Sequence, residues 1–182
     1  MKAGQKLALF GNASYKLIAG GTGSGDVNRA YTIAIAQGLA GAGFAVSAPL
    51  SQAYAQYLKA EKAKLPKTKG LLDPAPVIAE MPLEASQLQA QAQTTDVALV
   101  TIGRSAGEGG DRKEANDFTL TAAEKTLLQQ VATAFHAQGK KVVVVLGLVR
   151  RRPRRRPGPR RHARRDRSLG GARRRRIVRQ RA

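Results

Sequence analysis

The chain has 182 residues, no cysteine and a formal net charge of +20 at pH 7. This length suits one domain with a sizeable core, and the lack of cysteine excludes disulfides and thiolate catalysis. No apolar run approaches the roughly 20 residues of a membrane-spanning helix, and the apolar stretch at the amino terminus is too short for a signal peptide. We therefore expect a soluble body with no membrane partner, in a compartment that the sequence leaves open.

Residues 6–10 and 28–42 predict the first strand and the first helix. The strand is a short apolar run that ends at Gly11. The helix follows a glycine-rich stretch and is expected to end at Gly41 and Gly43, because glycine favours helix ends. One face of the helix is predicted to be apolar and to contain Tyr31, Ile33, Ile35 and Leu39.

A second strand is predicted over residues 44–48 and a second helix over residues 51–64, with Ser51 as its N-cap. The apolar side chains of the helix recur at helical spacing. A connection that contains lysine and proline extends to about residue 76. We expect its lysines to be solvated, since no aromatic side chains alternate with them to stack on bases.

Residues 83–93 predict a short helix that leads into a strand over residues 96–103. The apolar run of this strand is continuous rather than alternating, which is typical of a parallel strand buried on both faces.

The last helix is predicted to begin at Thr121, which forms a capping-box pattern with Glu124, and to end at Gly139. A strand over residues 141–146 follows. The apolar face of the helix is predicted to contain Leu127, Leu128, Val131 and Phe135.

Strands that alternate with helices predict an α/β fold, a mostly parallel sheet with helices on both faces. Ligands of such sheets gather at loops beyond the carboxyl ends of the strands. Two glycine-rich stretches, residues 19–27 and 102–112, fall at such positions. Their placement favours a functional role.

The first stretch contains "GGTGSGD". It lacks the lysine of a phosphate-binding loop and begins nine residues after the strand instead of opening a helix at once, which disfavours a nucleotide site. A flexible turn and a carbohydrate-facing loop both stay open.

The second stretch contains "GRSAGEGGDR", in which glycines flank Glu108 and let the backbone expose its carboxylate. Asp111 and Arg112 are expected to pair locally. Spacing alone favours a solvated turn over a catalytic loop here. His136, near a helix end, and His162 make no metal site, and no cofactor is predicted.

The segments "KLALFGN", "GGTGSGDV" before a helix, "DVALVTIGRSAGEGGDR", "FTLTAAEKTLL" and "KKVVVVL" follow one another in a familiar order. Over residues 4–146 they resemble the carboxy-terminal α/β sandwich domain of family 3 glycoside hydrolases, the beta-glucosidase type. The resemblance implies that Glu108 is the acid/base of a retaining glycosidase and that Ser24 contacts the sugar. The expected substrate is a glucoside or an oligosaccharide.

In that family an amino-terminal barrel domain supplies the aspartate nucleophile, and this sequence contains no such barrel. A retaining mechanism needs two carboxyl groups about 5 to 5.5 Å apart. Asp111 is not expected to replace the nucleophile, because it lies in the same loop as Glu108. We therefore expect the isolated chain to have no appreciable glycosidase activity.

The positive charge is concentrated at the carboxyl end. Residues 150–182 contain 17 arginines, no lysine and one acidic residue, against 15 basic and 11 acidic side chains in residues 1–149. The chain therefore divides into an incomplete sandwich domain, residues 1–147, and an arginine-rich tail, residues 148–182. The tail is expected to be disordered, because like charges and few apolar residues cannot offset chain entropy.

Arginine without lysine, mixed with proline, glycine and alanine, favours an out-of-frame translation of GC-rich DNA over a selected basic arm. In either case the tail is predicted to bind nucleic acid nonspecifically, with a steep salt dependence. A small nucleic-acid-binding protein is the alternative function. Loss of the family's final strands also predicts an uncovered sheet edge and a domain that is marginally stable or prone to aggregate.

Overall fold

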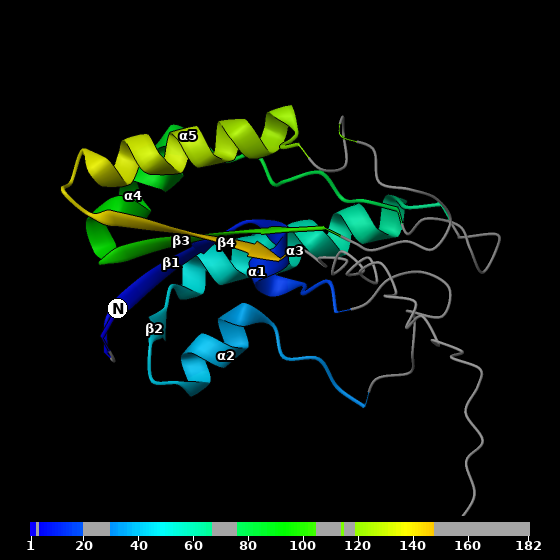
Figure 1. The fold of residues 1–182 in the computed structure, drawn as a ribbon, viewed down its shortest axis with the longest axis horizontal. Coiled ribbons are helices and arrows are strands. Elements are labelled where there is room, and N and C mark those ends of the chain that lie inside the picture. Colours follow the sequence, from blue (N-terminus) through cyan, green and yellow to red (C-terminus); the bar gives the residue numbers. More distant parts are fainter. Residues whose placement is uncertain (3, 20–29, 67–75, 105–113, 115–118, 148–182) are drawn as a thin grey trace, which may run out of the picture. The chain divides into compact units, whose positions relative to one another are not determined.

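The computed structural model describes residues 1–2, 4–19, 30–66, 76–104, 114 and 119–147 (Figure 1), and the structural statements below concern these residues. The predicted tail, residues 148–182, lies outside them. No helix in these ranges is long and apolar enough to cross a membrane.

A parallel sheet of four strands, in the order β2-β1-β3-β4, forms the centre of the fold. Neighbouring strands pair in parallel throughout. The two inner strands are apolar and almost fully buried, as the continuous apolar runs predicted. The strands are β1 (Lys6–Phe10), β2 (Ala45–Val46), β3 (Val97–Gly103) and β4 (Lys141–Gly147).

Helices cover both faces of the sheet, which confirms the predicted α/β class. Buried side chains of α3 (Ala48–Lys64), α4 (Ala85–Thr94) and α5 (Ala122–His136) join Phe10 and Val100 in one cluster. On the other face, α2 (Ile35–Gly41) packs against the remaining side chains of β1 and β3. Figure 1 shows α4 and α5 on one side of the sheet and α2 on the other.

The helix predicted over residues 28–42 is shorter than expected, because its described part begins at Ile35. Residues 30–34 are not helical, and Ala34 is extended. The amide of Ala34 donates to the Gln37 side chain, which closes the first turn at this point. Tyr31 and Ile33 are 78% and 56% exposed, so their assignment to the apolar face was wrong. The left-handed Gly43 follows the helix, as predicted.

The next helix begins earlier than predicted, and the strand before it is correspondingly shorter. The structure has α3 starting at Ala48 with Ser47 as its N-cap residue, and only Ala45–Val46 as strand. Pro49 explains the difference, because proline is favoured in the first helical turn, where its missing N–H needs no partner. Ser51 lies inside the helix, and its hydroxyl donates to the Ser47 carbonyl at 2.8 Å.

The predicted start of α5 is confirmed, and the helix ends at His136, shortly before the predicted Gly139. Thr121 is the N-cap, its hydroxyl accepts from the Glu124 amide at 3.2 Å, and its own amide donates to Glu124 Oε2 at 2.8 Å. At the other end, Gly139 is left-handed with φ +64°. The predicted apolar face contains the buried side chains of Leu127, Val131 and Phe135, with Leu128 partly buried beside them.

The outer strand β4 leaves apolar side chains uncovered. Among the described residues it pairs only with β3, and it forms one edge of the sheet. Val144 and Leu146 are 47% and 57% exposed. The predicted uncovered edge is therefore present in the described part of the chain.

Candidate active site

Phe10, the last residue of β1, is in register with Val100 of β3, and β3 continues to Gly103 beside the turn that follows β1. The turn after β1 requires glycine. Gly11 has φ +88°, and a Cβ there would lie 2.2 Å from the Thr101 carbonyl oxygen. The backbone of the turn can thus pass close to β3. The Gly11 backbone amide donates to the Tyr54 hydroxyl at 2.9 Å.

A one-turn helix that sequence analysis missed, α1 (Asn12–Tyr15), follows this glycine. It brings Ser14 back to the strand ends, where the Ser14 hydroxyl lies 2.7 Å from Thr101 Oγ1 and 2.8 Å from the Phe10 carbonyl oxygen. Ser14 and Thr101 are both almost fully buried. These contacts hold the ends of the two strands at a fixed spacing.

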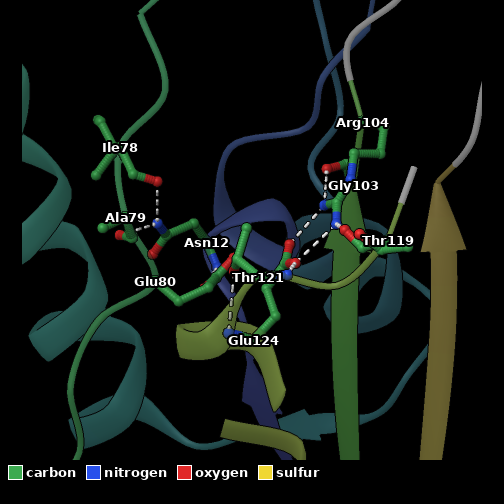
Figure 2. A network of polar contacts seen from close by, with 9 residues as sticks. All are labelled: Asn12, Ile78, Ala79, Glu80, Gly103, Arg104, Thr119, Thr121 and Glu124. Carbon is green, nitrogen blue, oxygen red and sulfur yellow. Dashed lines mark hydrogen bonds and ion pairs between the residues drawn. The ribbon is translucent and has the colours of Figure 1, made fainter. Parts of the chain in front are cut away.

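Arg104 follows the last residue of β3 and contacts both sides of the gap in the described chain. Its Nη1 donates to Glu124 Oε1 at 2.5 Å and to the Gly103 carbonyl at 3.0 Å. Its Nη2 donates to Glu124 Oε2 at 2.7 Å and to the Thr119 carbonyl at 3.2 Å. Figure 2 shows the guanidinium between the end of β3 and the start of α5.

The Arg104–Glu124 pair is almost removed from water, with side chains 11% and 7% exposed. Burial by itself would raise the pKa of Glu124. Hydrogen bonds from Arg104 and Thr121 oppose that effect and hold the pKa below its ordinary value. Glu124 is therefore a carboxylate at neutral pH.

Asn12 and Glu80 form a second part of the network (Figure 2). The backbone amide of Asn12 donates to Glu80 Oε2 at 2.8 Å, and the side-chain nitrogen of Asn12 donates to the Ala79 carbonyl at 2.8 Å. Burial raises the pKa of Glu80 to about 7, against the opposing hydrogen bond from Asn12. The charge of Glu124 raises it further, and Arg104 lowers it. The pKa values of Glu80 and Glu124 are thus shifted in opposite directions.

The site residues predicted from the sequence, Glu108 and Ser24, lie outside the described residues, as do Asp111 and Arg112. His136 is the last residue of α5, at the opposite end of that helix from Glu124.

Sequence analysis missed Asn12, Glu80 and Arg104 at this edge of the sheet. Only Glu124 had been singled out, by its capping-box pattern. Arg104 and Thr119 stand directly before and after residues 105–118, so the network contacts both ends of the segment that contains Glu108. No cluster of three or more histidine, aspartate or glutamate side chains that could hold a metal ion occurs among the described residues.

Comparison with known proteins gives consistent matches. Residues 1–153 match the family described as glycosyl hydrolase family 3 C-terminal domain. A beta-glucosidase of Ruminococcus albus is 32% identical over 142 residues, which is 77% of this chain and 14% of that protein. Beta-glucosidase A of Butyrivibrio fibrisolvens is 28% identical over 173 residues, 81% of this chain and 20% of that protein.

Among solved structures, beta-glucosidase 3B from Thermotoga neapolitana in complex with glucose superposes with a TM-score of 0.72 and 36% identity. The match covers 80% of this chain and 20% of that enzyme. The chain therefore spans about one fifth or less of the length of these relatives. The matches give no support to the alternative of a nucleic-acid-binding protein.

Proposed function

The chain belongs to glycosyl hydrolase family 3, as a C-terminal domain of that family, and we propose that it supplies the acid/base carboxyl group of a retaining beta-glucosidase through Glu108. The observation that carries this proposal is the position of the segment. Residues 105–118 begin where β3 ends, at the edge of the sheet where α/β folds bind ligands. Arg104 and Glu124 join the two ends of the segment at this edge.

Ser24 is proposed to contact the sugar in the same subsite. It belongs to the segment between α1 and α2, which follows β1 as the Glu108 segment follows β3. The two strands pair side by side. Segments that follow neighbouring parallel strands start at the same edge of the sheet, which supports a shared site. The proposed substrate class is a glucoside or an oligosaccharide.

The aspartate nucleophile is proposed to come from a barrel domain outside this sequence. A retaining mechanism requires an attacking carboxylate and a second carboxyl group that protonates the leaving oxygen. This chain spans 14% to 20% of the length of the beta-glucosidases that it matches. The isolated chain is therefore expected to leave an aryl glucoside intact.

The proposal is tested in a chimera in which residues 1–153 replace the matching domain of Thermotoga neapolitana beta-glucosidase 3B. Glu108→Gln is expected to lower kcat/KM on phenyl glucoside by about 100-fold to 10,000-fold, the range for loss of a general acid. The kcat/KM on dinitrophenyl glucoside is expected to fall much less, because its leaving group departs with little need for a proton and kcat/KM does not include the later step in which water releases the sugar. Glu114→Gln, an exposed carboxyl group in the same stretch, is the matched control.

Equal losses on both substrates would contradict an acid role for Glu108. A folded chimera without activity, or a Glu108→Gln chimera as active as its parent, would refute the proposed function. Ser24→Ala is expected to raise KM. Its effect on kcat for dinitrophenyl glucoside is expected to be smaller than its effect on KM. Hydrolysis by the isolated chain that Glu108→Gln abolishes would overturn the expected need for a barrel.

A further inference from the structure

We propose that Arg104 and Glu124 are positioning residues that fix the two ends of residues 105–118 and thereby set where Glu108 is presented. This inference rests on the proposed function of Glu108. It concerns the described side chains at the two ends of the segment. Neither side chain is assigned a chemical step of its own.

The Arg104 guanidinium bonds residues on both sides of the segment. Arg104 donates to Gly103 on the strand side of the segment and to Thr119 on the helix side. The fork of the same group bonds both oxygens of Glu124, in the first turn of α5. One side chain thus ties the end of β3 to the start of α5, with the Glu108 segment between them in sequence.

The Arg104–Glu124 pair is buried. The Arg104 and Glu124 side chains are 11% and 7% exposed, whereas those of Lys64 and Glu61 in α3 are 69% and 31% exposed. Removing an ion pair from water carries a desolvation penalty that the attraction between the charges often fails to exceed. Stability alone is therefore a weak reason for a buried pair here. A pair with good geometry can instead specify one local arrangement, which is the role inferred here.

Helix capping does not explain the bonds between Arg104 and Glu124. Thr121 and Glu124 complete the capping box by themselves, through one bond in each direction. Arg104 is separated from Glu124 by 20 positions and adds contacts that the helix end does not need. Its planar fork also matters, because lysine carries the charge but lacks the paired donors.

The experiment uses the full 182-residue chain, which has no cysteine and accepts a single nitroxide label without background. One labelled chain carries Ala106→Cys, inside the segment, and a second carries Gln129→Cys, on the exposed surface of α5. Each is combined with Arg104→Lys or Glu124→Gln. Glu61→Gln, which breaks the exposed pair in α3, is the matched control.

At position 106 we expect the immobilised component of the spectrum to be lost in both Arg104→Lys and Glu124→Gln and kept in Glu61→Gln. At position 129 we expect no change, because the helix keeps its place. An unchanged spectrum at position 106 would overturn the proposal. A change at both labels would also overturn it, because the substitution would then have disturbed the folded domain as a whole and not one segment.

The label measurement does not depend on hydrolysis, so its failure can be told apart from failure of the proposed function. If Glu108→Gln leaves the chimera fully active, the acid/base assignment fails even where the pair still orders position 106. If the acid/base assignment holds and the label at position 106 does not respond, only the positioning role fails.

Discussion

Replacing Glu80 by glutamine is expected to stabilise the domain at pH 8 and to leave its stability at pH 5 nearly unchanged. The pKa of Glu80 rises from an ordinary 4.5 to about 7 in the folded chain, mainly through burial. In the unfolded chain the carboxyl group returns to its ordinary value. The folded state therefore binds the proton more tightly than the unfolded state does.

This difference fixes the sign of the pH dependence. Below about pH 4.5 Glu80 is protonated in both states, and its contribution is fully present. Between 4.5 and about 7 the unfolded state releases the proton first, so the free energy of unfolding falls as pH rises. At about 1.4 kcal/mol per pKa unit, the loss is at most about 3.5 kcal/mol. Glutamine is neutral at every pH and keeps an oxygen to accept from Asn12.

Urea denaturation at pH 5, 6, 7 and 8 measures the effect as the difference between the Glu80→Gln chain and its parent. Taking this difference cancels groups that do not interact with Glu80; Glu124, which does interact with it, has a lowered pKa and stays largely ionised over this pH range. A difference that stays constant from pH 5 to pH 8, or that shrinks as pH rises, would refute the reasoning.

Three further changes test other parts of the described fold. Arg104→Gln leaves Glu124 buried without its cation and is expected to lower the free energy of unfolding by about 3 to 5 kcal/mol, measured by urea denaturation. A loss within about 0.5 kcal/mol would show that the pair is solvated. Gly11→Ala combines a positive φ with a contact of 2.2 Å to the Thr101 carbonyl oxygen, and is expected to cost about 3 kcal/mol or more. The matched control is Gly43→Ala, which shares the positive φ but has no atom within 4 Å of the added Cβ, so thermal melting should show a clearly smaller loss. Leu146→Lys on the edge strand is expected to reduce aggregation, measured by light scattering, while changing stability by about 0.5 kcal/mol or less. Unchanged scattering would mean that this edge does not drive association.

The elements that sequence analysis predicted well are those whose signals are local. The continuous apolar runs of β1 and β3 and the capping box of α5 depend on neighbouring residues, and the structure contains all three. The start of α2 was wrong, because apolar spacing placed Tyr31 and Ile33 on a helical face that the chain does not form there.

Contacts between residues far apart in the sequence were out of reach. Asn12 bonds the backbone of Ile78 and Ala79 and the side chain of Glu80, which lie 66 to 68 positions further on in the sequence. No local pattern marks either side of these contacts. In the sequence alone, Arg104 is one charged residue in a polar loop, because its partner Glu124 lies 20 positions further on. The family resemblance identified Glu108 as a candidate acid, and it carried no information on the contacts that surround the segment.

Glu80 and Glu124 show what decides the protonation of a carboxyl group at this edge of the sheet. Glu124 is buried and Glu80 is half-buried, and for both burial raises the pKa. They differ in the donors that reach them: Glu124 bonds the Arg104 cation twice and the Thr121 amide, while Glu80 accepts from the neutral Asn12 amide. Burial without a cation therefore favours the protonated form, and burial beside a cation favours the carboxylate.

The same physics sets a requirement for Glu108 as a general acid. An acid must hold its proton near the working pH, which needs a raised pKa. A nearby carboxylate and exclusion of water both raise it. In the proposed enzyme both contributions are expected to come from the barrel domain. A carboxyl titration followed by NMR is therefore expected to give Glu108 a higher pKa in the chimera than in the isolated chain, and equal values in the two would show that the barrel does not prepare the acid.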